Sequence, residues 1–179
     1  MATASNNNKP PLAALVQAGE QQTEAIPISD GIFMAKDISN AYLVTTAAGD
    51  VLVNAGFMAS AERNKSVFSA VRTGPLKNII LTQGHADHYG GVPDLKEEST
   101  QIIAERRFTE TCAFFTRLMP YLGRRSARLW SGTIKRGNNP VPTIVPDIEV
   151  DECYDFELGD FIGCFSIDKS LLEDLSANS

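Results

Sequence analysis

The sequence is poor in histidine and in cysteine. Its 179 residues include two histidines and three cysteines. Cys112, Cys153 and Cys164 are odd in number, and no two of them have CxxC spacing. This usage is typical of reduced thiols, so we expect a cytoplasmic protein.

The sequence also lacks a long hydrophobic run. Residues 1–9 are polar, and the apolar stretch 12–16 is too short for a secretory signal or a membrane-spanning helix. We therefore expect no membrane association. The net charge of -6 argues against nucleic acid as a partner, although residues 105–136 hold eight Lys or Arg and two acidic residues.

The length is sufficient for one domain with a hydrophobic core, because 43% of the residues are hydrophobic. We predict a flexible tail at residues 1–24, a domain at 25–166 and an irregular tail at 167–179. Within the first tail, residues 12–22 are compatible with a short helix.

From residue 25 onward the pattern predicts strands followed by helices, which indicates an α/β fold. Strands are expected at 25–28, 32–34, 40–46, 50–54, 78–82 and 101–104, with a strand and a turn at 153–161. A helix through residue 72 would begin after Ser60 as N-cap and end at Gly74 and Pro75. A short helix is expected at 92–95 and an extended connection at 138–147.

Residues 105–130 have the apolar periodicity of a long helix. Phe108, Cys112, Phe115, Met119 and Leu122 form one continuous stripe, so we expect this helix to pack on the rest of the domain. Phe114, Leu118 and Tyr121 widen the stripe, and Pro120 should kink the helix or end its first half.

Both histidines lie in the stretch 82–91, TQGHADHYGG, directly after the buried-type strand 78–82. The carboxyl end of a strand is where open α/β sheets usually bind ligands. Imidazole and carboxylate groups crowded into such a loop provide the ligands of a transition metal. The alternative is a hydrogen-bonded polar turn without metal.

With its strand, this stretch resembles the His-x-His-x-Asp-His signature of the metallo-β-lactamase superfamily, which often has Gly-Gly just beyond it. The resemblance covers about residues 27–160 and extends to alkyl-sulfatase-like and other metallo-hydrolases. It implies an α/β/β/α sandwich in which two sheets pack face to face with helices outside.

The resemblance also assigns roles to individual residues. It places His85 on a first zinc ion, and Asp87 and His88 on a second. Asp87 would also orient the nucleophilic water or carry its proton, which makes it the candidate catalytic residue. Gln83 occupies the place of the first histidine and would be a weaker, harder metal ligand than imidazole. Asn54 replaces the aspartate of the family's Asp-Thr-Gly strand end.

The family takes further ligands from its C-terminal half, but no histidine follows His88. A catalytic zinc ion normally has three protein ligands. We therefore expect this chain to be a truncated, N-terminal half of the sandwich. One sheet face would then be bare, and such an apolar surface promotes self-association.

We predict a metal-dependent hydrolase that uses one or two zinc ions on a small-molecule ester, sulfate ester or lactam-like substrate. The alternative is a non-catalytic fragment or pseudoenzyme that acts as an interaction module. Arg124, Arg125 and Arg128 form either a solvated helix face or a clamp for a sulfate or carboxylate. Tyr89 and Trp130 either line a substrate pocket or belong to the core.

Overall fold

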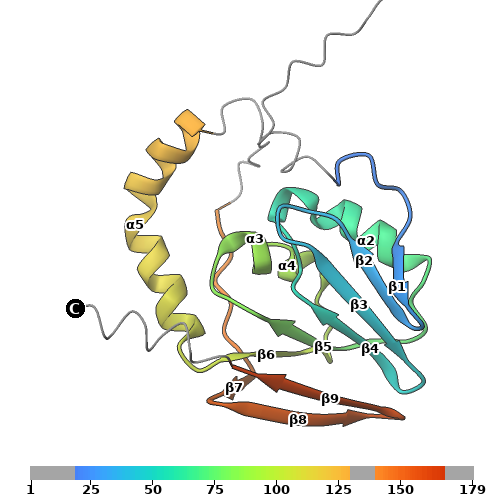
Figure 1. Cartoon of the computed structure of the whole chain (residues 1–179). Coiled ribbons are helices and arrows are strands. Elements are labelled where there is room, and N and C mark those ends of the chain that lie inside the picture. The colour runs from blue at the N-terminus through green and yellow to red at the C-terminus, as the bar shows by residue number, and fades with distance from the viewer. Residues whose placement is uncertain (1–18, 130–139, 168–179) are drawn as a thin grey trace, which may run out of the picture.

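The structure is a computed structural model that describes residues 19–129 and 140–167 (Figure 1). Its main element is a seven-stranded sheet with the strands in chain order. These strands are β1 (Ile26–Ser29), β2 (Ile32–Ala35), β3 (Ala41–Thr46), β4 (Gly49–Val53), β5 (Leu76–Leu81), β6 (Gln101–Glu105) and β7 (Ile148–Val150). A separate hairpin pairs β8 (Cys153–Leu158) with β9 (Phe161–Ser166).

The strand pairing changes from antiparallel to parallel at β4. β1 to β4 are joined as antiparallel neighbours, and Gly49 starts β4 with φ +128°, a conformation that favours glycine. From β4 to β7 the neighbours are parallel, so each connection must cross back over the sheet. The connections contain η1 (Met58–Ser60) and α2 (Ala61–Ser69), then α3 (Ala86–Tyr89) and α4 (Val92–Leu95), and finally α5 (Phe108–Leu129).

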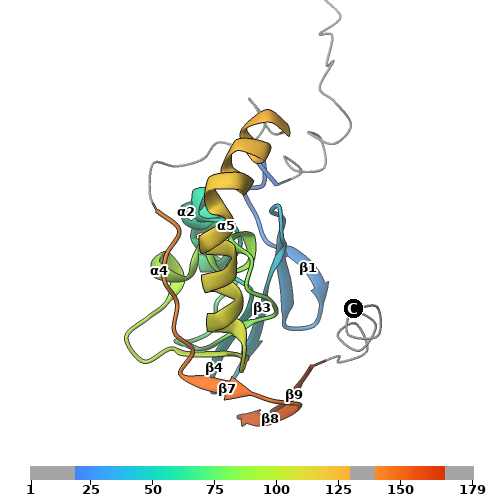
Figure 2. The same ribbon diagram turned by 90° about the vertical axis from the view of Figure 1, so that its left-hand side faces the viewer.

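Apolar side chains cover both faces of this sheet. On one face the core includes Val67 and Phe68 of α2, Leu95 of α4 and Phe108 of α5. On the other face, sheet residues pack against the hairpin; the cluster contains Val51, Ile80, Ile103, Val150, Tyr154, Phe156, Leu158 and Phe165. The predicted α/β fold is confirmed, and the face expected to be bare carries the β8–β9 hairpin (Figure 2).

Most predicted elements are present, with corrected bounds. The helix expected to run through residue 72 ends at Ser69, and its C-cap is Ala70 rather than Gly74. Ser60 makes no side-chain capping hydrogen bond, because its hydroxyl donates instead to the Asp37 carboxylate at 2.9 Å. The strands β7 and β9 and the one-turn helix α3 were not predicted from the sequence.

α5 continues through Pro120 as one helix, so Pro120 does not end its first half, which was one of the two expectations. Only its first turns pack closely: Phe108 is buried, whereas Phe114, Met119 and Tyr121 are exposed. The helix extends past the edge of the sheet, which leaves its second half without the expected packing surface among the described residues (Figure 1).

The described part of the predicted N-terminal tail is attached to the sheet. Gln22 donates a hydrogen bond to the carbonyl of Met34 at 3.0 Å, and its amide oxygen accepts one from the Lys36 N–H at 2.7 Å. Residues 19–21 form a turn, so the described end of the short helix considered for 12–22 is not helical, and residues 12–18 lie outside the described residues. No helix in the described part of the chain is both long and apolar enough to cross a membrane.

Candidate metal centre

The histidine stretch lies at the carboxyl ends of β4 and β5. After β5 the chain turns into α3, whose residue His88 accepts a hydrogen bond through its carbonyl from the Ala55 N–H at 2.7 Å. The Gly91 N–H donates to the Gly56 carbonyl at 3.1 Å. A Cβ at Gly91 would lie 2.4 Å from the Ala55 carbonyl oxygen, so only glycine permits this close approach.

Asn54 links the two strand ends from within. It is buried and has φ +58°, a left-handed conformation that asparagine tolerates better than most residues. Its Oδ1 accepts hydrogen bonds from the Thr82 backbone N at 3.1 Å and from the Thr82 hydroxyl at 3.0 Å. The Thr82 hydroxyl in turn lies 3.3 Å from His88 Nδ1, so Asn54 orients the imidazole through Thr82.

Asp87 and His88 converge on the hydroxyl of Ser39. Ser39 Oγ hydrogen-bonds to the Asp87 carboxylate and lies 2.9 Å from His88 Nε2. The Asp87 Oδ2 and His88 Nε2 atoms are 3.7 Å apart. The residues between β2 and β3, which include Ser39, therefore complete a polar site with the motif.

The environment of His88 favours its neutral form. Burial lowers the pKa of His88 below its ordinary value of 6.5, and nearby His85 also lowers it, while the Asp87 carboxylate opposes the shift. Neutral imidazole is the form that binds a metal, so the local electrostatics suit a ligand role.

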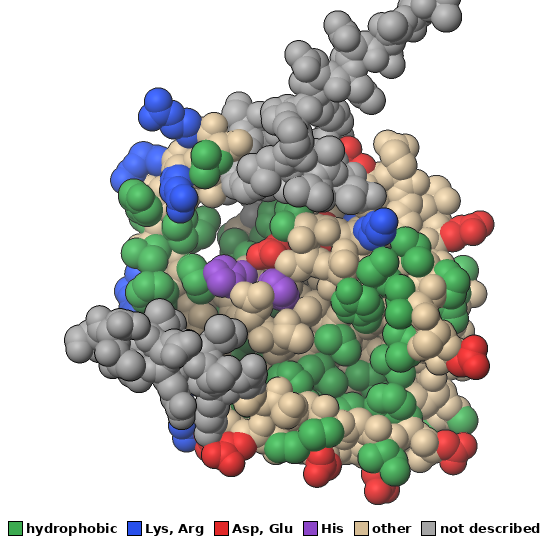
Figure 3. Space-filling view, in the orientation of Figure 1, with side chains coloured by type: hydrophobic (Ala, Val, Ile, Leu, Met, Phe, Trp, Pro, Cys, Tyr) green, Lys and Arg blue, Asp and Glu red, His purple; other side chains and the backbone are tan. Residues whose placement is uncertain are grey.

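His85 points to a second position. Its Nδ1 contacts the amide oxygen of Gln83, and its ring lies against Phe115 of α5 with 4.1 Å between the ring centroids. The four predicted site residues thus form two pairs, Asp87 with His88 and Gln83 with His85. The two histidine side chains are close together on an open, hollowed surface (Figure 3).

The paired arrangement fits a divalent metal in the chemistry of its donors. Carboxylate, neutral imidazole and amide oxygen are all metal ligands. Each pair supplies two donors, whereas a catalytic zinc ion takes three protein ligands. Among the described residues the motif therefore provides part of a ligand set at each position.

A cavity of about 810 Å³ opens beside this motif. Gln83 and Gly84 form one wall, while Phe114, Phe115 and Arg117 of α5 form another. The end of β9 completes the lining. The apolar rings next to the motif are suited to the apolar part of a small substrate, and the lining carries both signs of charge, with Arg107 and Arg117 beside Glu105 and Glu110.

The other residues considered from the sequence lie elsewhere. Tyr89 is buried and packs edge-on against Phe108 at 5.5 Å, so it belongs to the core. Arg124, Arg125 and Arg128 are exposed on α5, as expected of a solvated helix face. Trp130 lies outside the described residues.

Sequence reasoning missed Ser39 and Phe115 as neighbours of the histidines. Ser39 lies 48 residues before Asp87, and no local pattern joins the two. The sequence places Phe115 on the same apolar helix face as Phe108 and Cys112, which predicts a core residue rather than a neighbour of the histidines. Only the packing of α5 beside the loop brings its ring to His85.

Three solved structures are similar to this architecture. The alignment with a metallo-β-lactamase that has a HARLDQ motif, from Cronobacter sakazakii, covers 84% of this chain and 51% of that protein. The sequence identity is 21% and the TM-score is 0.57. The alignment with the inverting sec-alkylsulfatase Pisa1 from Pseudomonas sp. covers 87% of this chain and 32% of that protein, at 13% identity and a TM-score of 0.68. A subclass B3 metallo-β-lactamase of Bradyrhizobium japonicum aligns at 22% identity, a TM-score of 0.55, and 78% and 49% coverage.

These likenesses show a shared fold, and the chain spans about half or less of each of these three proteins. Comparison with curated protein sequences gave no significant match. The family model described as the metallo-beta-lactamase superfamily matches residues 35–163, which is well over half of the chain. The chain therefore belongs to the metallo-β-lactamase superfamily.

Proposed function

We propose that this chain belongs to a metal-dependent hydrolase whose metal is held by Asp87 and His88, with His85 and Gln83 at a neighbouring position. The observation that carries the proposal is the 3.7 Å separation of Asp87 Oδ2 and His88 Nε2 at the strand ends, on the same loop whose Gln83 lines a cavity of about 810 Å³. A bound Zn²⁺ supplies Lewis acidity that lowers the pKa of a water molecule to about 7.

In this proposal Asp87, Ser39 and Thr82 have separate roles. The Asp87 carboxylate accepts and returns the proton of the attacking water. The Ser39 hydroxyl donates a hydrogen bond to the Asp87 carboxylate and so positions that side chain. Thr82 fixes the other nitrogen of the His88 ring, which selects the tautomer that leaves Nε2 available as a ligand.

Gln83 does not argue against this proposal. Its amide oxygen contacts His85 Nδ1, so the oxygen of Gln83 and the imidazole of His85 are two possible ligands at the same position. The Cronobacter sakazakii neighbour has a motif written HARLDQ, whose letters also depart from the family's His-x-His-x-Asp-His. We infer that the superfamily fold accommodates such replacements.

The cavity supports a small ester with an apolar portion as substrate. Phe114 and Phe115 provide apolar walls, and Arg117 provides a cation for an anionic group such as a sulfate or carboxylate. The related structures include an alkylsulfatase and β-lactamases, so sulfate esters and lactams are the first substrates to test.

The test combines metal analysis with hydrolysis assays on the purified chain. We expect zinc uptake by the wild type that His88→Ala reduces, and hydrolysis of an aryl sulfate, an aryl ester or a chromogenic lactam. Asp87→Asn should lower the hydrolysis rate at least about 100-fold, because the proton acceptor is lost. Asp94→Asn, an exposed carboxylate on α4, is the matched control and should leave both readouts unchanged.

A second candidate is an interaction module without catalysis. It is favoured by the incomplete ligand pairs and by the exposed apolar residues Phe114 and Tyr121 on α5. This alternative predicts that wild type and His88→Ala take up the same amount of zinc and behave identically. Zinc-dependent turnover that His88→Ala abolishes would exclude it.

A further inference from the structure

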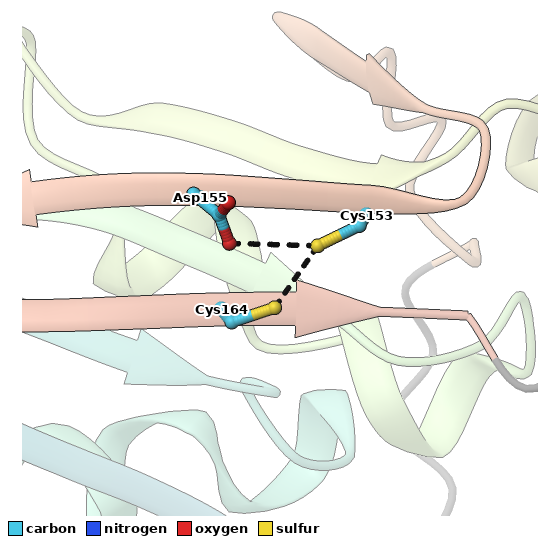
Figure 4. A group of neighbouring side chains, drawn as sticks. All are labelled: Cys153, Asp155 and Cys164. Atoms are coloured by element: carbon cyan, nitrogen blue, oxygen red, sulfur yellow. Dashed lines mark hydrogen bonds between the residues drawn. The ribbon is translucent and has the colours of Figure 1, made fainter.

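The outward face of the β8–β9 hairpin carries two of the three cysteines. Along β8 the side chains alternate between exposed and half-buried, with Tyr154 and Phe156 directed at the sheet. Cys153 and Asp155 therefore project outward, and Cys164 of β9 projects from the same face (Figure 4).

These three side chains form a compact cluster of metal-ligating atoms. Cys153 Sγ lies 3.0 Å from Cys164 Sγ and 3.5 Å from Asp155 Oδ1. One ligand atom from each residue lies within 4.8 Å of the other two. In the part of the chain that the structure describes, no other three His, Cys, Asp or Glu residues gather this closely.

We propose that Cys153, Cys164 and Asp155 bind one thiophilic divalent cation such as Zn²⁺ or Cd²⁺, with water as the fourth ligand. Binding replaces the two thiol protons, which are released to solvent, by two sulfur–metal bonds and one oxygen–metal bond. Two thiolates and a carboxylate carry three negative charges, so the site favours a divalent cation over an anion or a neutral ligand.

The distances agree with tetrahedral coordination after a small adjustment. With zinc–sulfur bonds of about 2.3 Å and zinc–oxygen bonds of about 2.0 Å, the sulfur and oxygen ligands are separated by about 3.5 Å. This equals the observed separation of Cys153 Sγ and Asp155 Oδ1. The two sulfurs need to part by less than about 1 Å, which exposed side chains on a hairpin can accommodate.

The strand register argues for a metal rather than a disulfide. Cys164 is paired across the hairpin with Asp155, and Cys153 is paired with Ser166, so the two cysteines are diagonal neighbours. Diagonal positions are about 7–8 Å apart, whereas a disulfide joins Cα atoms about 4.4–6.8 Å apart. The observed 3.0 Å between the two sulfurs lies between about 2.05 Å for a disulfide and about 3.8 Å for two thiolates on one zinc ion, and only the metal site also uses Asp155.

This cation site is separate from the histidine motif and needs no part of it. The hairpin packs on the sheet face that is formed by Val51, Ile80, Ile103 and Val150. His85, Asp87 and His88 instead lie at the carboxyl ends of the strands. Variants at either place can therefore be interpreted independently.

Cadmium titration of the reduced, metal-free full chain tests the proposal. Cd²⁺ bound to thiolates gives a sulfur-to-metal charge-transfer band in the ultraviolet, which histidine and carboxylate ligands do not give. We expect a band that saturates at about one Cd²⁺ per chain. Cys153→Ser and Cys164→Ser should each abolish the tight phase, and Asp155→Asn should weaken Cd²⁺ binding by about tenfold or more.

Two control variants keep the outcome specific. Cys112→Ser removes the half-buried thiol of α5, and His88→Ala removes a ligand of the motif; both should retain the band. Because Cys153, Asp155 and Cys164 are exposed, their variants should also retain the unfolding midpoint of the wild type.

Three results would overturn the proposal. The first is absence of the band in the wild type, and the second is a band that survives both cysteine substitutions. The third is oxidation of the cysteine pair by glutathione disulfide at the same rate with and without saturating Cd²⁺, measured as loss of two hydrogens by mass spectrometry.

Discussion

Asn54 Oδ1 accepts two hydrogen bonds from Thr82, one from its backbone N at 3.1 Å and one from its hydroxyl at 3.0 Å. This contact ties the end of β4 to the first residue after β5. Because Thr82 also lies beside His88 Nδ1, a single buried amide supports both the sheet edge and the candidate metal centre.

Because of this contact, two substitutions of Asn54 should lower the free energy of unfolding by different amounts. Asn54→Gly loses the hydrogen bonds but keeps the φ +58° conformation, so the free energy of unfolding should fall by about 1–2 kcal/mol. Asn54→Ala also strains the backbone and should cost about 2–3 kcal/mol. Urea denaturation measures both, and equal losses would contradict a contribution from the backbone conformation.

Two glycine substitutions should have opposite effects on stability. In Gly91→Ala the new Cβ would meet the Ala55 carbonyl oxygen at 2.4 Å, so the loop must shift and stability should fall by about 2 kcal/mol or more. Gly123→Ala meets nothing within 4 Å on α5 and should raise stability by up to about 1 kcal/mol. Thermal unfolding of the two variants provides the comparison.

Glu97 should make stability depend on pH in the acidic range. The Arg72 guanidinium, 2.6 Å away, lowers the pKa of Glu97 below its ordinary value of 4.5, and the Leu76 N–H contributes. A depressed carboxyl pKa stabilises the fold above pH 4.5, and this stabilisation is lost as the pH falls through the folded-state pKa.

Glu97→Gln should therefore lower the free energy of unfolding at neutral pH by about 0.5–1 kcal/mol, a modest value because the pair is partly exposed. The difference from wild type should shrink as the pH falls below the folded-state pKa of Glu97, because protonated Glu97 is then as neutral as the glutamine. Glu98→Gln, an exposed neighbour with no ion pair among the described residues, is the control. A difference that persists unchanged in acid would contradict the assignment to this carboxylate.

The exposed apolar surface of α5 predicts self-association of the purified chain. Phe114 is 49% and Tyr121 60% exposed on the same helix. Light scattering after gel filtration should show a concentration-dependent increase in mass, because burying these rings removes apolar surface from water. The double variant Phe114→Ser with Tyr121→Ser should reduce the increase, whereas Thr109→Ser should not. A monomer at all concentrations would refute this prediction.

Much of the architecture could be predicted from short-range patterns. The short β-type segments 40–46 and 50–54 led to the strands β3 and β4. The strand before His85, together with the motif and its two glycines, led to the superfamily that the family model matches. Such features depend on neighbours in the chain, so they are visible before folding.

Other features depend on contacts between distant residues, and only the tertiary structure decided them. Ser39 reaches Asp87 across 48 positions, and Cys153 meets Cys164 because of the hairpin register. The apolar stripe of α5 predicted a packed helix, yet the sheet ends before the helix does. Periodicity shows which face of an element is apolar, but the length and position of its packing partner determine whether that face is buried.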